Sequence, residues 1–175
     1  LFILRSPAGH ESPTPWTAGP HPGPARPHET PPYPYPMREA YHESLHEIDT
    51  LLIEMTRLVG RAMNHATQAL LDADLQEAES VIAEDAQLDS IRADIDERAT
   101  QIVALQQPVA GELRRLLSAL RIATSLERMG DLAVHVAKTT RLRYPGTVVP
   151  VELRGVISDM GAVAQRIVHQ TGAAM

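Results

Sequence analysis

The chain has 175 residues, no cysteine and a formal net charge of −6 at pH 7. Without cysteine it has no disulfide, thiolate metal site or cysteine nucleophile, and the acidic balance argues against a nucleic-acid-binding protein, which usually presents a basic face. Only 3% of the residues are aromatic. Because strands draw on aromatic and β-branched residues, this composition favours helices over a β-sandwich or a parallel sheet. No apolar run approaches the roughly 18 residues of a transmembrane helix.

The first 36 residues differ from the rest, because they hold 11 of the 14 prolines. Proline lacks the backbone donor that helices and strand ladders need, so we expect residues 1–36 to be disordered. Such a segment would serve as a polyproline ligand or a tether. We favour a third interpretation, an upstream extension outside the functional protein, because helical periodicity begins directly after Met37.

From Met37 onward, apolar residues recur at helical spacing. Asp74 is a candidate N-cap, Pro108 marks a tight turn between two helices, and the segment Tyr144-Pro145-Gly146-Thr147 is a strong turn signal. The predicted helices cover about 38–71, 75–82, 83–106, 108–143 and 152 to the end of the chain.

Two of these helices have apolar faces that we expect to enter the core. In the helix after Pro108 the expected core residues are Leu113, Leu116, Leu117, Leu120, Ala123, Met129, Ala133 and Val136. In the last helix they are Leu153, Ile157, Met160, Ala164 and Ile167.

The last helix repeats the first. Residues 51–70 align without gaps on 156–175, so that Met55 falls on Met160 and Arg61 on Arg166. This match suggests a tandem three-helix unit whose second copy is cut off, and we expect a chain that ends inside a helix to be a fragment. The predicted fold is all-α: an elongated antiparallel three-helix bundle over 37–144, followed by a linker and the first helix of a truncated second bundle over 145–175.

Four carboxylates stand out in the two helices that meet at Pro108. Asp85 with Asp89, and Glu127 with Asp131, are acidic pairs one helical turn apart, which repel each other slightly. Asp85 precedes Pro108 by as many residues as Asp131 follows it, and the same holds for Asp89 and Glu127. An antiparallel hairpin that turns at Pro108 therefore places the four carboxylates at two matching levels.

Carboxylates gathered at a helix seam repel unless they are protonated or bridged by a cation. An oxygen-rich cluster suits Mg, Ca, Mn or Fe, and His135 could add a nitrogen ligand. The alternative is a solvated acidic edge with arginines such as Arg92 and Arg128 as partners. Glu39–His42 and Glu43–His46 have the Glu-x-x-His spacing of di-iron bundles, but both lie on one helix.

Three motifs resemble the PhoU family of phosphate-transport accessory and regulatory proteins. Residues 126–133 (Leu-Glu-Arg-Met-Gly-Asp-Leu-Ala) match its E-R-x-G-D signature, residues 105–114 resemble its turn between helices 2 and 3, and residues 85–89 resemble its acidic helix 2 motif. Met37-Arg38 resembles the family's natural start. The chain departs from the family pattern by its proline-rich leader and by lacking most of the second bundle.

The resemblance implies two three-helix bundles per subunit, with Asp85, Asp89, Glu127 and Asp131 as ligands of iron or zinc. The oxygen donors of these four residues also keep Mg and Mn as candidates. It also implies a cytoplasmic, non-enzymatic negative regulator of phosphate uptake and phosphate-starvation signalling, a homodimer when full length and peripheral to membrane complexes. Its expected partners are the phosphate ABC transporter ATPase (PstB-like) and a sensor histidine kinase (PhoR-like), with no nucleic acid.

Two other hypotheses remain open. One is a carboxylate-bridged di-metal oxidase or hydrolase on a helical bundle. Only two residue pairs hint at it, namely Asp131 with His135 and Glu43 with His46. The other is a purely structural bundle without metal, whose thermal stability would be indifferent to a chelator.

Overall fold

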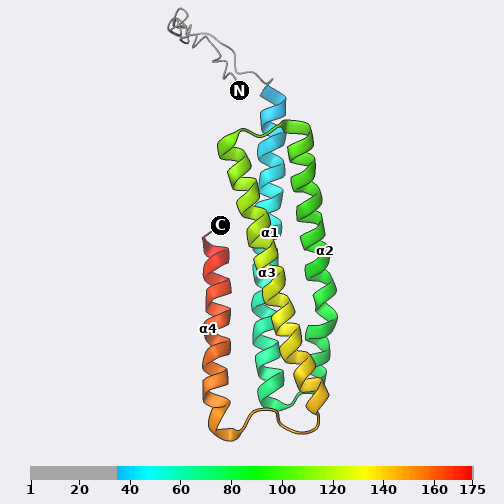
Figure 1. Cartoon of the computed structure of the whole chain (residues 1–175), viewed down its shortest axis with the longest axis vertical. Helices are drawn as coiled ribbons and strands as arrows, with labels where there is room; N and C mark the ends of the chain where they lie inside the picture. Colours follow the sequence, from blue (N-terminus) through cyan, green and yellow to red (C-terminus); the bar gives the residue numbers. More distant parts are fainter. Residues whose placement is uncertain (1–34, 175) are drawn as a thin grey trace, which may run out of the picture. The chain divides into compact units, whose positions relative to one another are not determined.

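The computed structural model describes residues 35–174, and every regular element among them is helical. This confirms the all-α prediction. The elements are α1 (Tyr35–Asp72), α2 (Leu75–Gln106), α3 (Ala110–Arg143), the short 3₁₀ helix η1 (Val151–Leu153) and α4 (Arg154–Ala173) (Figure 1). Most of the predicted disordered leader lies outside the described residues. Its last two residues, Tyr35 and Pro36, belong to α1, so this helix begins earlier than predicted.

Helices α1, α2 and α3 form an antiparallel bundle in which each packs against the other two (Figure 1). The short connections at 73–74 and 107–109 force consecutive helices to run in opposite directions. The fully buried side chains at the centre of the main core include Ile48, Leu52, Met55, Ile95 and Leu116. None of the described helices is both long and apolar enough to cross a membrane.

Helix α2 is continuous from Leu75 to Gln106, so the prediction of two separate helices over 75–82 and 83–106 was wrong. No glycine or proline interrupts this stretch, and the buried side chains of Val81 and Leu88 lie on either side of the expected junction. The predicted cap is confirmed, because the backbone N–H of Glu77 donates to Oδ1 of Asp74 at 3.0 Å.

The core face of α3 is rotated from the predicted one. Leu116, Ala123 and Ala133 are buried as expected, but Leu113 and Leu117 are exposed. At 100° per residue, a face centred on Leu116 and Ala123 turns Leu117 outward. The buried face instead continues through residues that the prediction left out, namely Ala119, Leu126, Gly130, Val134, Ala137 and Thr140.

Helix α4 packs against α1, antiparallel to it (Figure 1). Val168 is buried in the main core cluster, and the glycines of α4 allow a close approach. A Cβ at Gly161 would lie 2.6 Å from Thr67, and one at Gly172 would lie 2.7 Å from Thr56. Three residues expected in the core are exposed, namely Leu153, Met160 and Ile167. Met160 and Ile167 are exposed because α4 meets α1 on a different face, whereas Leu153 belongs to η1, before α4 begins.

Candidate functional site

The register of the α2–α3 hairpin agrees with the prediction from Pro108. Arg92 and Thr124 are equally far from Pro108, and Nη2 of Arg92 donates to Oγ1 of Thr124 at 3.1 Å. The helices approach closely beside this contact: a Cβ at Gly130 would lie 2.2 Å from Cδ2 of Leu88. Gly130 thus has a packing role in the signature that contains Glu127 and Asp131.

Asp89, one turn along α2, and Asp131, across the seam on α3, both act electrostatically on Asp85. Asp85 is half-buried, whereas Asp89 and Asp131 are exposed. Burial raises the pKa of Asp85 above its ordinary value of 3.8, and the negative charges of Asp89 and Asp131 raise this pKa further. The nearby Lys138 and His135 lower it. Charges from both helices therefore act on Asp85, as the hairpin register predicted for this level.

Glu127 has a different neighbour. Nε of Arg92 lies 3.7 Å from Oε2 of Glu127, and the same guanidinium forms an ion pair with Asp96 one turn along α2. At the level of Glu127, an arginine thus supplies the positive charge that a cation would otherwise bring. The alternative interpretation of the sequence, a solvated acidic edge, included Arg92 as a partner of these carboxylates. The ion pair of Arg92 with Glu127 confirms that contact.

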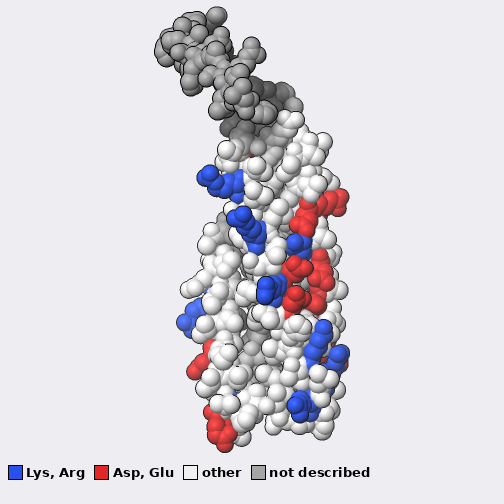
Figure 2. Space-filling model, viewed as in Figure 1, with Lys and Arg blue, Asp and Glu red and all other residues white. Residues whose placement is uncertain are grey.

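The acidic residues lie along the seam with basic residues between them. Figure 2 shows Asp and Glu side chains gathered over the α2 and α3 edge of the viewed face, with Lys and Arg side chains interleaved. Within residues 35–174, no group of three or more His, Asp or Glu side chains has an arrangement that could hold a metal ion. The donor atoms suit a hard divalent cation, but in the structure no three of these side chains are gathered at one point. The assignment of Asp85, Asp89, Glu127 and Asp131 as ligands stays a prediction.

The raised pKa of Asp85 makes a prediction about stability and pH. Because the folded chain binds this proton more tightly than the unfolded chain, the free energy of unfolding falls as the pH rises through the raised pKa, and the penalty persists at pH 7. We expect metal-free Asp85→Asn to unfold at a higher temperature than the parent chain at pH 7. Below the ordinary Asp pKa of 3.8, where the carboxyl is protonated in both states, the two unfolding temperatures should be equal.

Thermal unfolding at pH 7 and pH 3 measures this effect. The control is Asp159→Asn, which removes the same charge from an exposed position on α4. If Asp159→Asn stabilised the chain at pH 7 as much as Asp85→Asn, net charge rather than the seam would be the cause.

Comparison with known proteins identifies a family. The family profile described as "PhoU domain" matches residues 52–140, which include all four carboxylates. The chain is 49% identical over 128 residues to "Phosphate-specific transport system accessory protein PhoU homolog 1" of Mycobacterium tuberculosis, an alignment that covers 73% of this chain and 58% of that protein.

Two further relatives agree with this match. Homolog 2 of Mycobacterium tuberculosis is 48% identical over 128 residues, covering 73% of this chain and 60% of that protein. The Aquifex aeolicus homolog is 38% identical over 96 residues, covering 55% of this chain and 43% of that protein. The present chain thus spans less than two thirds of the length of these relatives. Over the part that it spans, the profile match, the identities and the helical bundle agree, and the chain belongs to the PhoU family.

Proposed function

We propose that this chain acts as an accessory protein and negative regulator of phosphate uptake and phosphate-starvation signalling. The observation that carries the proposal is the 49% identity over 128 residues to a protein named as an accessory protein of phosphate-specific transport. The relatives are named as accessory proteins, not as enzymes, which favours a binding role over the di-metal oxidase or hydrolase.

In this role the chain is an adaptor between the phosphate ABC transporter ATPase and a sensor histidine kinase. An adaptor needs surface that is free to bind, and α4 offers an exposed apolar stripe made of Val156, Met160, Val163 and Ile167. Stripes of this kind mark helix or protein contacts. The expectations of a homodimeric full-length protein, a cytoplasmic location and a peripheral place at membrane complexes belong to the same proposal.

Co-purification tests the adaptor role. The tagged chain is incubated with the purified ATPase and sensor kinase of the source organism's phosphate uptake system, each at micromolar concentration, and with an unrelated transporter ATPase as control. We expect retention of the first two and not of the control. Retention of neither partner would contradict the adaptor role.

We also propose that the four carboxylates of the seam take up a divalent cation, with Fe, Zn, Mg and Mn as candidates. The support comes from the electrostatic effect of Asp89 and Asp131 on Asp85 and from the oxygen donors of all three side chains. Since Glu127 pairs with Arg92, binding by all four requires that Glu127 exchange this guanidinium for the metal.

Metal analysis of the loaded full chain separates the four contributions. We expect the Asp85→Asn/Asp89→Asn/Asp131→Asn variant to lose bound metal and also the thermal stabilisation that metal gives the parent chain. Glu127→Gln is expected to lower the affinity further where Glu127 is a ligand. The control is Asp94→Asn, on the same helix and paired with Arg98. Unchanged occupancy in the triple variant would disprove the assignment.

A further inference from the structure

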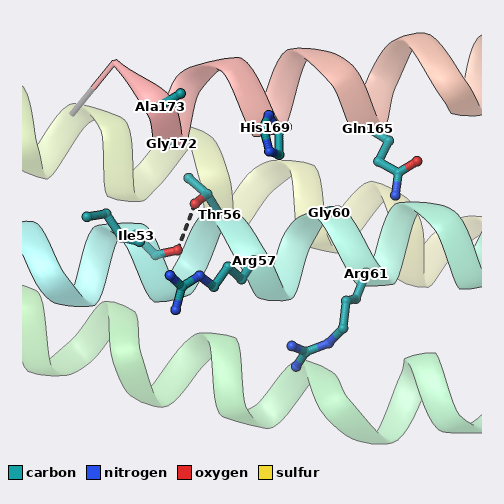
Figure 3. Close-up of a pocket in the computed structure, with 9 residues that line it drawn as sticks. All are labelled: Ile53, Thr56, Arg57, Gly60, Arg61, Gln165, His169, Gly172 and Ala173. Carbon is teal, nitrogen blue, oxygen red and sulfur yellow. Dashed lines mark hydrogen bonds between the residues drawn. The ribbon is translucent and has the colours of Figure 1, made fainter.

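The face of the molecule formed by α1 and α4 contains an open groove with a volume of about 510 Å³ (Figure 3). Ile53, Arg57 and Arg61 line it from α1, and Gln165, His169 and Ala173 line it from α4. The floor is hollow because Gly60 and Gly172 carry no side chain where the helices approach each other. Its size falls in the range of small-molecule sites, about 300 to 1,000 Å³.

The groove is lined by donors and by cations, and no carboxylate is among its lining residues. Arg57 and Arg61 lie one helical turn apart along α1, and Gln165 extends from α4 toward α1 (Figure 3). Neither arginine forms an ion pair within the described part of the chain, in contrast to Arg92, Arg98 and Arg115. Their guanidinium groups are therefore available to an external anion.

The contact between α1 and α4 has approximate two-fold symmetry, which matters for the access to this groove. In the alignment of 51–70 on 156–175, Thr56 corresponds to Gly161 and Thr67 to Gly172. The two close contacts, Thr56 with Gly172 and Thr67 with Gly161, are therefore equivalent to each other. A two-fold axis that relates antiparallel helices in this way is perpendicular to the plane of the two helices.

This symmetry places the groove away from the apolar surfaces. The α4 stripe of Val156, Met160, Val163 and Ile167 corresponds to Leu51, Met55, Leu58 and Ala62. These four residues belong to, or pack against, the core clusters that α1 forms with α2 and α3. Both apolar faces thus lie on one side of the α1–α4 plane. At 100° per residue, Arg57, Arg61 and His169 lie on the other side. A partner or a further helix that covers the α4 stripe leaves the groove open.

We propose that this groove binds a small anion that carries two or more phosphoryl groups. A guanidinium presents a planar fork of N–H donors that matches phosphoryl oxygens in a bidentate manner. Two such forks, on side chains whose Cβ atoms are about 5 to 6 Å apart, serve linked phosphoryl groups better than a single one. Gln165 and His169 add hydrogen-bonding groups from the α4 side, and Ile53 and Ala173 provide apolar contacts for an organic moiety. The proposal is independent of the adaptor role and of the carboxylate seam.

Isothermal titration calorimetry of the full chain in metal-free buffer tests it, with pyrophosphate, ATP, inorganic phosphate and citrate as the four probes. We expect saturable binding of one pyrophosphate or ATP per chain, at least tenfold weaker binding of inorganic phosphate, and a loss of at least tenfold in affinity in Arg57→Ala/Arg61→Ala. Tighter binding of ATP than of pyrophosphate identifies a nucleotide, and the reverse order identifies an inorganic anion.

Two further variants keep the test specific. Arg114→Ala/Arg121→Ala removes the same charge from exposed positions of α3 and should bind like the parent chain. Arg57→Lys/Arg61→Lys keeps the charge, removes the forks, and should bind several-fold more weakly. The proposal is overturned by no saturable binding of any probe, by equal loss in the two alanine double variants, or by citrate binding more tightly than pyrophosphate and ATP. Circular dichroism confirms that each variant is folded.

Discussion

Leu116→Ala is expected to lower the free energy of unfolding by about 3 kcal/mol, within the range of about 2 to 5 kcal/mol for leucine truncations in cores. Leu116 is 1% exposed and belongs to the main core cluster, together with Ile48 and Leu52 of α1 and Ile95 of α2. Removing its side chain forfeits the transfer free energy and leaves a cavity where α1, α2 and α3 meet. Urea unfolding at pH 7, followed by circular dichroism, measures the change.

The neighbouring leucine is the matched control. Leu117 is 45% exposed, so Leu117→Ala removes the same atoms from the same helix with little loss of packing. We expect a change of less than about 1 kcal/mol. Equal destabilisation by the two substitutions would mean that α3 is rotated about its axis relative to the structure described here.

Local signals explain why much of the fold could be predicted. Asp74 caps α2 through its own side chain, and the turn around Pro108 follows from a residue that lacks a backbone donor. Once the turn is placed, the antiparallel register of the hairpin follows by counting, as the contact of Arg92 with Thr124 confirms. Each of these inferences needs only residues that are close in the sequence.

The rotation of a helix about its axis is set by its partners. Leu116 and Leu117 have the same side chain, and only the positions of α1 and α2 decide which of them is buried. In α4, the sequence shows an apolar stripe through Met160 and Ile167, but the contact with α1 uses the glycine-bearing face because small residues allow the closest approach. An apolar pattern predicts that a face is covered; it does not predict by which helix.

The candidate site likewise has a part that could be predicted from the sequence and a part that could not. Counting from Pro108 brings Asp85 and Asp131 to one level, with Asp89 one turn away on α2, and the effect of Asp89 and Asp131 on the pKa of Asp85 agrees with this placement. The pairing of Glu127 with Arg92 could not be derived by counting residues from Pro108. Several arginines lie near the seam in the sequence, and side-chain packing selects among them. The arginine groove was missed because its residues come from α1 and α4, whose contact no turn residue specifies.

Gly161→Val is expected to separate α4 from α1 at a cost of about 2 kcal/mol, since overpacking of a tight contact costs about 1 to 3 kcal/mol. A Cβ at this position would lie 2.6 Å from both Oγ1 and Cγ2 of Thr67. Thr67 has little room to move, because its branched side chain is stiff and its hydroxyl donates to the carbonyl oxygen of Met63 at 2.7 Å. Hydrogen exchange measures the result: the amides of α4 should exchange faster, while those of α2 keep their protection.

Two variants decide whether the contact with Thr67 is the cause. Gly155→Val lies on the same helix, where an added Cβ meets nothing within 4 Å, and should leave exchange in α4 unchanged or slightly slower, since valine has a higher helix propensity than glycine. Thr67→Ala in the Gly161→Val background removes the opposing γ atoms and should restore part of the lost protection. Faster exchange in Gly155→Val, or no recovery in the double variant, would show that the helix propensity of α4 and not its fit to α1 governs its docking.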